Sequence, residues 1–275
     1  MRIVEEPPGL PPRPLDGHKG LFGRVLIVGG SRDMIGAPAL AGAAALRMGS
    51  GLVQIAMPRE VLASAISVVP ELVGLALEET PQNLSHLLEA AEQADVLVIG
   101  PGLGQSPWAS RRIDALIRLQ KPAVVDADAL NYLASLKSWP ARFKLNAVLT
   151  PHPGEMKRLV KQAVPTDDAG RLALAASAAK KFGQIILLKG HRTVVTDGRR
   201  AYFNHSGDSS LSKAGSGDVL SGMLASLVGQ GMDLFDAACA AAFLHGRAGE
   251  IAGKELGRRC VLARDVIEAI PDAIK

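Results

Sequence analysis

Apolar strand-like runs alternate with helix-like runs along most of this sequence, and this alternation limits the folds that the chain can adopt. The first strand is expected in RVLIVGG (24–30), a small-residue helix follows at 37–51, and the next strand is LVQIAMP (52–58). Strands that alternate with helices form a parallel sheet that is covered on both faces. The sequence therefore predicts an α/β fold, a three-layer αβα sandwich with a mostly parallel sheet. Further strands are expected at the start of 94–104, 122–133 and 146–160, a strand, a turn and a second strand at 183–198, and mainly helix in the final third.

We expect one domain with a short extension. The 275 residues and their 48% hydrophobic content are enough for one large core, and we find no internal repeat or second domain boundary. The prolines of PPGLPPRP predict an extended N-terminal lead-in over residues 1–16. The domain itself is then expected to span residues 17–275.

Charge and composition argue against several functional classes. There are 31 basic and 27 acidic residues without a dense Lys/Arg run, which argues against nucleic-acid binding. No apolar run is long enough to span a membrane, and the proline-broken N-terminus does not resemble a signal peptide. Cys239 and Cys260 show neither metal-ligand spacing nor a disulfide framework. A cytoplasmic protein with reduced cysteines is expected.

Glycine or polar residues follow most of the expected strands. In a sheet of this kind, ligands bind beyond the carboxyl ends of the strands. The loops therefore predict a ligand site at one edge of the sheet. They are Gly29–Ser31, Gly100–Gly104, Asp126 with Asp128, Thr150–Glu155, and Lys189–Gly190.

The first glycine loop is similar to a dinucleotide-binding turn but departs from its pattern. The spacing of Gly29, Gly30 and Gly36 does not match G-x-G-x-x-G, and Glu60 lies beyond the end of the second strand rather than at it. The phosphate-binding pattern G-x-x-x-x-G-K-[ST] is absent as well. A redox dinucleotide site and a P-loop are therefore both disfavoured.

The stretch KAGSGDVLSG (213–222) places a lone carboxylate, Asp218, behind two glycines and in front of an apolar helical run. Free N–H groups at a helix N-terminus favour a phosphate or a developing anion. A carboxylate there can accept the proton of a hydroxyl that attacks phosphorus, as in kinases. Gly217 is expected to allow close backbone approach and a positive φ. The alternative is that Asp218 only caps the helix.

The AGSGD motif resembles the signature of the ribokinase-like superfamily. The full set of motifs, in order, resembles one branch of it, the ADP- or ATP-dependent NAD(P)H-hydrate dehydratases, over residues 17–271. The sequence departs from the family in Lys213 and Ala214, where small polar and glycine residues are common. The motifs are HKGLFGRVLIVGGS, GAPALAGAAALRMGSGLV, VLVIGPGLG, VVDADALNYL, VLTPHPGE, LLKGHRTVV and AGSGDVLSG, followed by the tail segments AACAAAFLHGRAGEIA and VLARDVIEAIP.

This resemblance implies repair of a damaged nicotinamide cofactor. The substrate would be the S epimer of hydrated NADH or NADPH (NADHX or NADPHX), which carries a hydroxyl on C6 of the ring. A nucleotide, ADP in preference to ATP, would phosphorylate this hydroxyl, and phosphate would then leave to restore the double bond. The family further implies Mg²⁺, a homo-oligomer such as a tetramer, and functional pairing with a separate NAD(P)HX epimerase.

The resemblance also assigns roles to individual residues. Asp218 would be the catalytic base and would contact the substrate, together with Ala37, Gly104 and His152. Asp126 and Glu155 would help to hold Mg²⁺ through water. The nucleotide would bind at Lys189, Gly190, His191, Arg192, Thr193 and Gly217, and the N–H groups of Gly215, Ser216 and Gly217 would form an anion hole.

Simpler explanations remain open for these positions. They are helix packing for Ala37, a plain turn at Gly104, a local backbone hydrogen bond for His152, a surface position for Lys189, and helix capping for Asp126 and Glu155.

Two other functions also remain open for the whole chain. One is a ribokinase-like kinase for small alcohols of the thiazole or pyrimidine type. The other is a regulator that binds nucleotide without turnover.

Overall fold

A computed structural model describes residues 1–275 and contains one ten-stranded sheet with the order β1-β10-β9-β8-β7-β6-β5-β2-β3-β4. Only β9 runs antiparallel to its neighbours. The predicted, mostly parallel sheet is therefore confirmed. The strands are β1 (Arg2–Val4), β2 (Arg24–Val28), β3 (Leu52–Pro58), β4 (Val73–Leu77), β5 (Val96–Ile99), β6 (Pro122–Val125), β7 (Asn146–Leu149), β8 (Ile185–Leu188), β9 (Val194–Thr196) and β10 (Arg200–Phe203).

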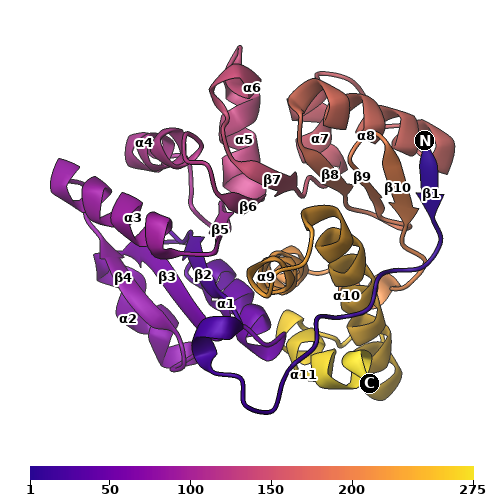
Figure 1. Cartoon of the computed structure of the whole chain (residues 1–275), viewed down its shortest axis with the longest axis horizontal. Coiled ribbons are helices and arrows are strands. Elements are labelled where there is room, and N and C mark those ends of the chain that lie inside the picture. The colour runs from indigo at the N-terminus through magenta and orange to yellow at the C-terminus, as the bar shows by residue number, and fades with distance from the viewer.

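Eleven α-helices cover the two faces of this sheet. In Figure 1, α1, α2, α9, α10 and α11 lie on one side of the strands, and α3 to α8 lie on the other. The helices are α1 (Gly36–Arg47), α2 (Arg59–Val68), α3 (Pro81–Gln93), α4 (Pro107–Leu116), α5 (Ala127–Ser135), α6 (Trp139–Arg142), α7 (Pro153–Val160), α8 (Asp168–Phe182), α9 (Ser216–Gly229), α10 (Leu234–Leu256) and α11 (Ala263–Ile274).

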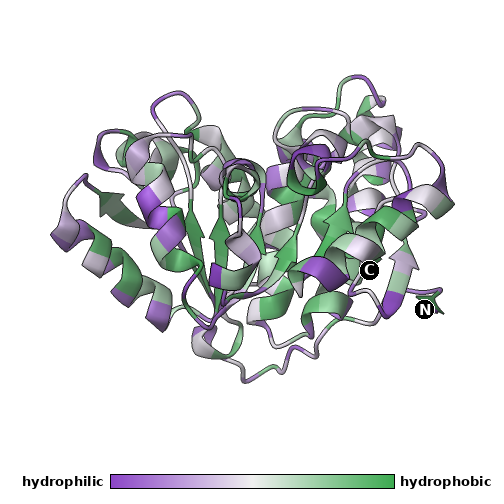
Figure 2. Cartoon of the chain, turned by 90° about the horizontal axis from the view of Figure 1, so that it is seen from above, coloured by the Kyte–Doolittle hydropathy of each residue, from purple (hydrophilic) through white to green (hydrophobic).

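Alternate side chains of each central strand pack into two separate hydrophobic cores, one on each face of the sheet. In β2, Val25 and Ile27 belong to the core under α1, α9, α10 and α11, whereas Leu26 and Val28 belong to the core under the opposite helices. This follows from the two-residue period of a strand, which sends successive side chains to opposite faces. Figure 2 shows the hydrophobic strands in green, and Figure 1 shows the strands between two helical layers, the three-layer sandwich that the sequence predicts.

Small residues allow α9 to lie very close to α1. A Cβ at Gly222 would sit 2.0 Å from the carbonyl oxygen of Ala41, so only glycine fits at this crossing. Most of α9 is buried between α1 and α10 (Figure 1). The N-terminus of α9 is thereby held in a fixed place.

The order of the strands creates a switch point beside β2. The chain adds β3 and β4 on one side of β2 and then returns to add β5 on the other side. Gly30 N donates to Pro101 O at 2.8 Å, so the loops after β2 and β5 touch at the carboxyl edge of the sheet. Ligands of open α/β sheets bind at such a point.

The first residues of the chain were not expected to join the sheet. Arg2–Val4 pairs in parallel with β10 and forms one edge of the sheet. The expected extended segment follows this strand and leads to β2. No helix in this chain is both long and apolar enough to cross a membrane.

Candidate active site

Helix α9 begins at a glycine and leaves its first turn free of side-chain caps. Gly215 is the N-cap residue, with φ 90°, and no side chain accepts a hydrogen bond from this end of the helix. Asp218 lies in the first turn without capping it, so the capping explanation for Asp218 is wrong. The positive φ expected at Gly217 is also wrong, because Gly215 is the residue that adopts it.

Lys189, Asp126 and Ser221 form a buried polar network next to this helix end. Lys189 Nζ donates to Asp126 Oδ1 at 2.8 Å, and Ser221 Oγ donates to Asp126 Oδ2 at 2.8 Å. Burial acts to lower the pKa of Lys189, but the carboxylates of Asp126, Glu155 and Asp218 outweigh it and raise this pKa above its usual value. Lys189 is therefore a largely buried, charged ammonium whose side chain is 19% exposed, rather than a surface lysine.

Asp218 is surrounded by charges that change its acidity. Burial raises the pKa of Asp218 to about 7, and the carboxylates of Asp126, Asp128 and Glu155 act in the same direction. Only Lys189 opposes them. A carboxylate with a pKa near neutrality suits a group that must accept and release a proton.

A buried arginine holds the loop after β8 in place. Arg171, on α8, is 6% exposed and donates to the carbonyl oxygens of His191 and Arg192 through Nη1 and of Leu188 and Lys189 through Nη2. One guanidinium thus binds four carbonyls at the end of β8 and in the loop that follows it.

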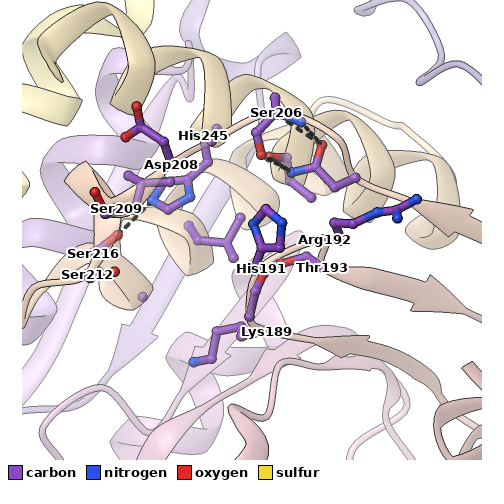
Figure 3. A pocket seen from close by; sticks show the side chains of 18 of the residues that line it. Lys189, His191, Arg192, Thr193, Ser206, Asp208, Ser209, Ser212, Ser216 and His245 are labelled. Carbon is purple, nitrogen blue, oxygen red and sulfur yellow. Dashed lines mark hydrogen bonds between the residues drawn. The ribbon is translucent and has the colours of Figure 1, made fainter. Parts of the chain in front are cut away.

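This loop borders a cavity of about 630 Å³ that also reaches the start of α9 (Figure 3). The cavity brings together the residues expected to bind nucleotide and two residues of the expected anion hole. The lining residues are His152, Lys189, Gly190, His191, Arg192, Thr193, Asn204, Ser206, Gly207, Asp208, Ser209, Leu211, Ser212, Lys213, Ser216, Gly217, Leu220, Ala242, His245 and Gly246.

Ala37 and Gly104 lie together but outside this cavity. A Cβ at Gly102 would sit 3.1 Å from that of Ala37, and Gly104 N donates to Asp128 Oδ2 at 2.8 Å. Ala37 follows β2 and Gly104 follows β5. Asp128, which is bonded to Gly104, raises the pKa of Asp218, so the Gly104 loop lies near that carboxylate.

His152 lies with the expected nucleotide segment rather than with Ala37 and Gly104. It is the N-cap of α7: its Nδ1 accepts from Gly154 N at 2.9 Å, while Glu155 Oε2 accepts from His152 N at 2.8 Å. Burial and the nearby Lys189 ammonium lower the pKa of His152, so the ring is neutral at pH 7. With Nδ1 as acceptor, the proton sits on Nε2, which lies 3.4 Å from Glu155 Oε1 on a half-exposed side chain.

The two carboxylates expected near Mg²⁺ have other partners in the structure. Asp126 accepts hydrogen bonds from Lys189, Ser221 and the N–H of Ala127, and it caps α5. Glu155 completes the cap of α7, and burial raises its pKa. No three His, Cys, Asp or Glu side chains cluster closely enough to bind a metal by themselves. The donor set fits only an ion whose remaining ligands are phosphate and water oxygens.

Several residues of the site were not predicted from the sequence. Arg171 lies in α8, outside the motifs of the family. Ser221 and His245 lie within such motifs, but their positions inside apolar helices indicated only core packing, and no role was predicted for them. Lys213, where the sequence departs from the family, donates to the carbonyl of Arg259 at 2.7 Å.

Proteins of known name match nearly the whole chain. A bifunctional NAD(P)H-hydrate repair enzyme of Moorella thermoacetica is 43% identical in an alignment that covers 97% of this chain and 52% of that protein. An ADP-dependent (S)-NAD(P)H-hydrate dehydratase of Neisseria meningitidis is 38% identical over 88% of this chain and 81% of that protein. The chain spans about half the length of the bifunctional relatives that it matches.

The fold has a close counterpart among solved structures. An ADP/ATP-dependent NAD(P)H-hydrate dehydratase from Bacillus subtilis, co-crystallised with ATP and Mg²⁺, superposes with a TM-score of 0.82 at 28% identity and covers 96% of this chain and 93% of that one. This likeness confirms the predicted ribokinase-like sandwich. The family profile described as NAD(P)H-hydrate dehydratase matches residues 25–272, and the chain therefore belongs to the NAD(P)H-hydrate dehydratase family.

Proposed function

We propose that this protein uses a nucleotide to dehydrate the S epimer of hydrated NADH or NADPH and so returns the intact cofactor. The observation that carries the proposal is Asp218, whose pKa is raised to about 7 at the uncapped N-terminus of α9. The family match and the names of the relatives support the choice of substrate.

The first step would be phosphoryl transfer to the substrate. The Asp218 carboxylate takes the proton of the C6 hydroxyl, and the oxygen attacks the terminal phosphorus of the donor. The N–H group of Gly217 would stabilise the charge that develops on the transferred group, together with that of Ser216, which donates to Lys213 O at 3.3 Å in this structure. With ADP as donor the other product is AMP, and with ATP it is ADP. The name of the Neisseria relative supports ADP as the preferred donor.

The second step would be elimination. The C6–O bond breaks with phosphate as the leaving group, C5 loses a proton, and the C5–C6 double bond of the nicotinamide ring is restored. Phosphorylation is needed because hydroxide is a poor leaving group, whereas phosphate is a good one. The reaction as a whole would be that of a carbon–oxygen lyase.

The two ligands would approach Asp218 from different sides. The donor would occupy the cavity beside Lys189–Thr193 and Gly217, with the Lys189 ammonium next to its phosphates. The substrate would lie along Ala37 and Gly104, and we propose that His152 reaches it with its Nε2–H from the edge of the cavity. Mg²⁺ would supply charge neutralisation for the donor phosphates, and Glu155 and Asp126 would contact it only through water.

The direct test is to mix the purified protein with (S)-NADHX or (S)-NADPHX and either ADP or ATP. We expect nicotinamide absorbance to recover only when a donor is present, with AMP formed from ADP. If no cofactor is restored while thiazole or pyrimidine alcohols are phosphorylated, the kinase alternative is correct. Tight nucleotide binding without turnover of any of these substrates would indicate a regulator.

We also propose that an epimerase acts with this protein by converting the R epimer of the hydrate to the S epimer. The relatives named bifunctional repair enzymes, of which the chain matches about half, support this pairing. A mixture of epimers should be repaired to about one half by this protein alone and completely after an epimerase is added, because only the S epimer is a substrate. Assembly into a homo-oligomer remains a prediction that light scattering can check.

A further inference from the structure

One buried histidine contacts the anion hole and has no role in the function described above. His245 lies in the middle of α10, is 8% exposed and lines the cavity. Its Nε2 is 3.2 Å from Ser216 Oγ, and Figure 3 shows this contact as a dashed line on one wall of the cavity. Ser216 is the first residue of α9, so His245 touches the helix end at which an anion would bind.

The ring is neutral under all conditions in which the protein would work. Burial lowers the pKa of His245 to about 4, a hydrogen bond with the backbone of Ser216 opposes this effect, and the Lys189 ammonium adds to it. A neutral imidazole carries its proton on one nitrogen only, so the contact with Ser216 can have either of two directions.

The direction of this hydrogen bond decides what the serine can offer an anion. If Ser216 donated its hydroxyl proton to Nε2, only oxygen lone pairs would face the cavity and they would repel a phosphoryl group. If Nε2–H donates to Ser216 Oγ, the hydroxyl proton is free to point at the anion. A bound phosphate therefore favours the Nε2–H form.

We propose that His245 is a positioning residue that donates Nε2–H to Ser216 Oγ and thereby turns the serine hydroxyl toward the transferred phosphoryl group. The proposal assigns Ser216 a side-chain hydrogen bond to the anion in addition to the backbone N–H groups of the helix end. Its kinetic part rests on the proposed function. The direction of the hydrogen bond does not, because it can be observed with inorganic phosphate.

The first experiment compares variants of similar size. His245→Gln keeps an N–H near the position of Nε2, whereas His245→Met removes it. We expect His245→Met to lower kcat on the order of tenfold to a hundredfold, less than the roughly 10²–10³ lost with an oxyanion-hole donor itself. The KM for ADP should change by less than about twofold, and His245→Gln should recover most of kcat. The exposed His205, replaced by Asn, is the matched control and should retain normal kinetics.

The same change made in a Ser216→Ala background separates positioning from packing. If His245 acts through the serine, His245→Met should cost less than about threefold once the hydroxyl is gone, because residues that act as a unit are not additive. An equal loss in both backgrounds, or a Gln variant no better than Met, would overturn the proposal.

The second experiment needs no activity and no variant. Nitrogen NMR of the wild-type protein with labelled histidine, recorded with inorganic phosphate, distinguishes the two neutral tautomers of His245. We expect the proton on Nε2, and a proton on Nδ1 would overturn the proposal even if the dehydratase reaction is confirmed. Conversely, a protein that is inactive on the hydrates counts against the proposed function, while the tautomer still decides the direction of the hydrogen bond.

Discussion

Asp218 owes its properties to neighbours that the chain brings from three separate strand ends. Asp126 follows β6, Glu155 begins the helix after β7, and Lys189 follows β8. Two of these groups are negative, and together with burial they outweigh the single ammonium and keep the pKa of Asp218 near neutrality. The same ammonium, held by Asp126, lines the cavity in which we propose that the donor binds.

Replacing this carboxylate should separate chemistry from binding. Asp218→Asn keeps the size of the side chain but cannot accept the hydroxyl proton. We expect the rate of cofactor recovery to fall by roughly 10²–10⁴-fold, with ADP affinity by calorimetry nearly unchanged. Near-normal turnover in the folded variant would show that Asp218 is not the base.

The acidity of Asp218 also predicts the pH dependence of the reaction. The base must be ionised in the free enzyme, so kcat/KM should rise with pH and level off above about 7. Rates measured from pH 5 to pH 9 check this profile. An inflection near the ordinary aspartate pKa of about 4 would mean that burial does not control this group.

The contribution of Asp218 to the free energy of unfolding should fall as pH rises, whereas kcat/KM should rise. A carboxyl whose folded pKa is raised binds its proton more tightly in the folded state, so its contribution to stability is lost as pH rises from about 4 to about 7. Asp218→Asn, which stays neutral, should become more stable than the wild type over this window, by on the order of 2–4 kcal/mol. Urea unfolding of both proteins at pH 5 and pH 8 measures the difference between their free energies of unfolding. If this difference were the same at both pH values, the prediction would be wrong.

Helix α9 carries Asp218 and Ser216, so its contact with α1 sets where they lie. Gly222→Ala would place a methyl group against the carbonyl of Ala41, where only 2.0 Å is free, and would push the helices apart. We expect a loss of about 1–3 kcal/mol in the free energy of unfolding and a lower kcat. Gly36→Ala is the matched control for stability, because nothing lies within 4 Å of the added carbon. If the two variants were equally stable, the contact between α1 and α9 would accommodate an added methyl group, and this prediction would be wrong.

The sequence predicted the strands and helices that are marked by a pattern of neighbouring residues. Leu52–Pro58 is an apolar run between loops, and its strand was predicted at both ends. Arg2–Val4 was missed because three residues beside a proline-rich stretch form a strand only by pairing with β10, a partner far along the chain. The site follows the same rule. Asp126, Lys189 and Asp218 follow strands or glycines and were predicted, whereas Arg171 and His245 occupy helix positions that look like ordinary core.

The overall arrangement places two sets of loops on either side of one helix end. Loops after β2 and β5 bring Ala37 and Gly104 together at the switch point of the sheet, whereas the loop after β8 borders the cavity beside Ser216 and Gly217. Asp218 lies in the first turn of α9, and its pKa is influenced by Lys189 of the second set and by Asp128 of α5, which accepts a hydrogen bond from Gly104 of the first set. This division suits a reaction that joins two separate ligands.

The proposed separation of the donor site from the substrate site can be tested by introducing valine into each of them. Gly217→Val adds its Cβ 3.3 Å from the Nζ of Lys189, in the wall of the cavity, so it should raise the KM for ADP and leave the KM for the hydrate nearly unchanged. Ala37→Val should do the reverse, because Ala37 lies outside the cavity and against Gly102. Each added clash should cost about 1–3 kcal/mol, or roughly fivefold to a hundredfold in affinity. Steady-state kinetics with each ligand varied in turn measure both effects. If both variants weakened the same ligand, the two sides would not be separate sites, and the donor and substrate would have to share the cavity.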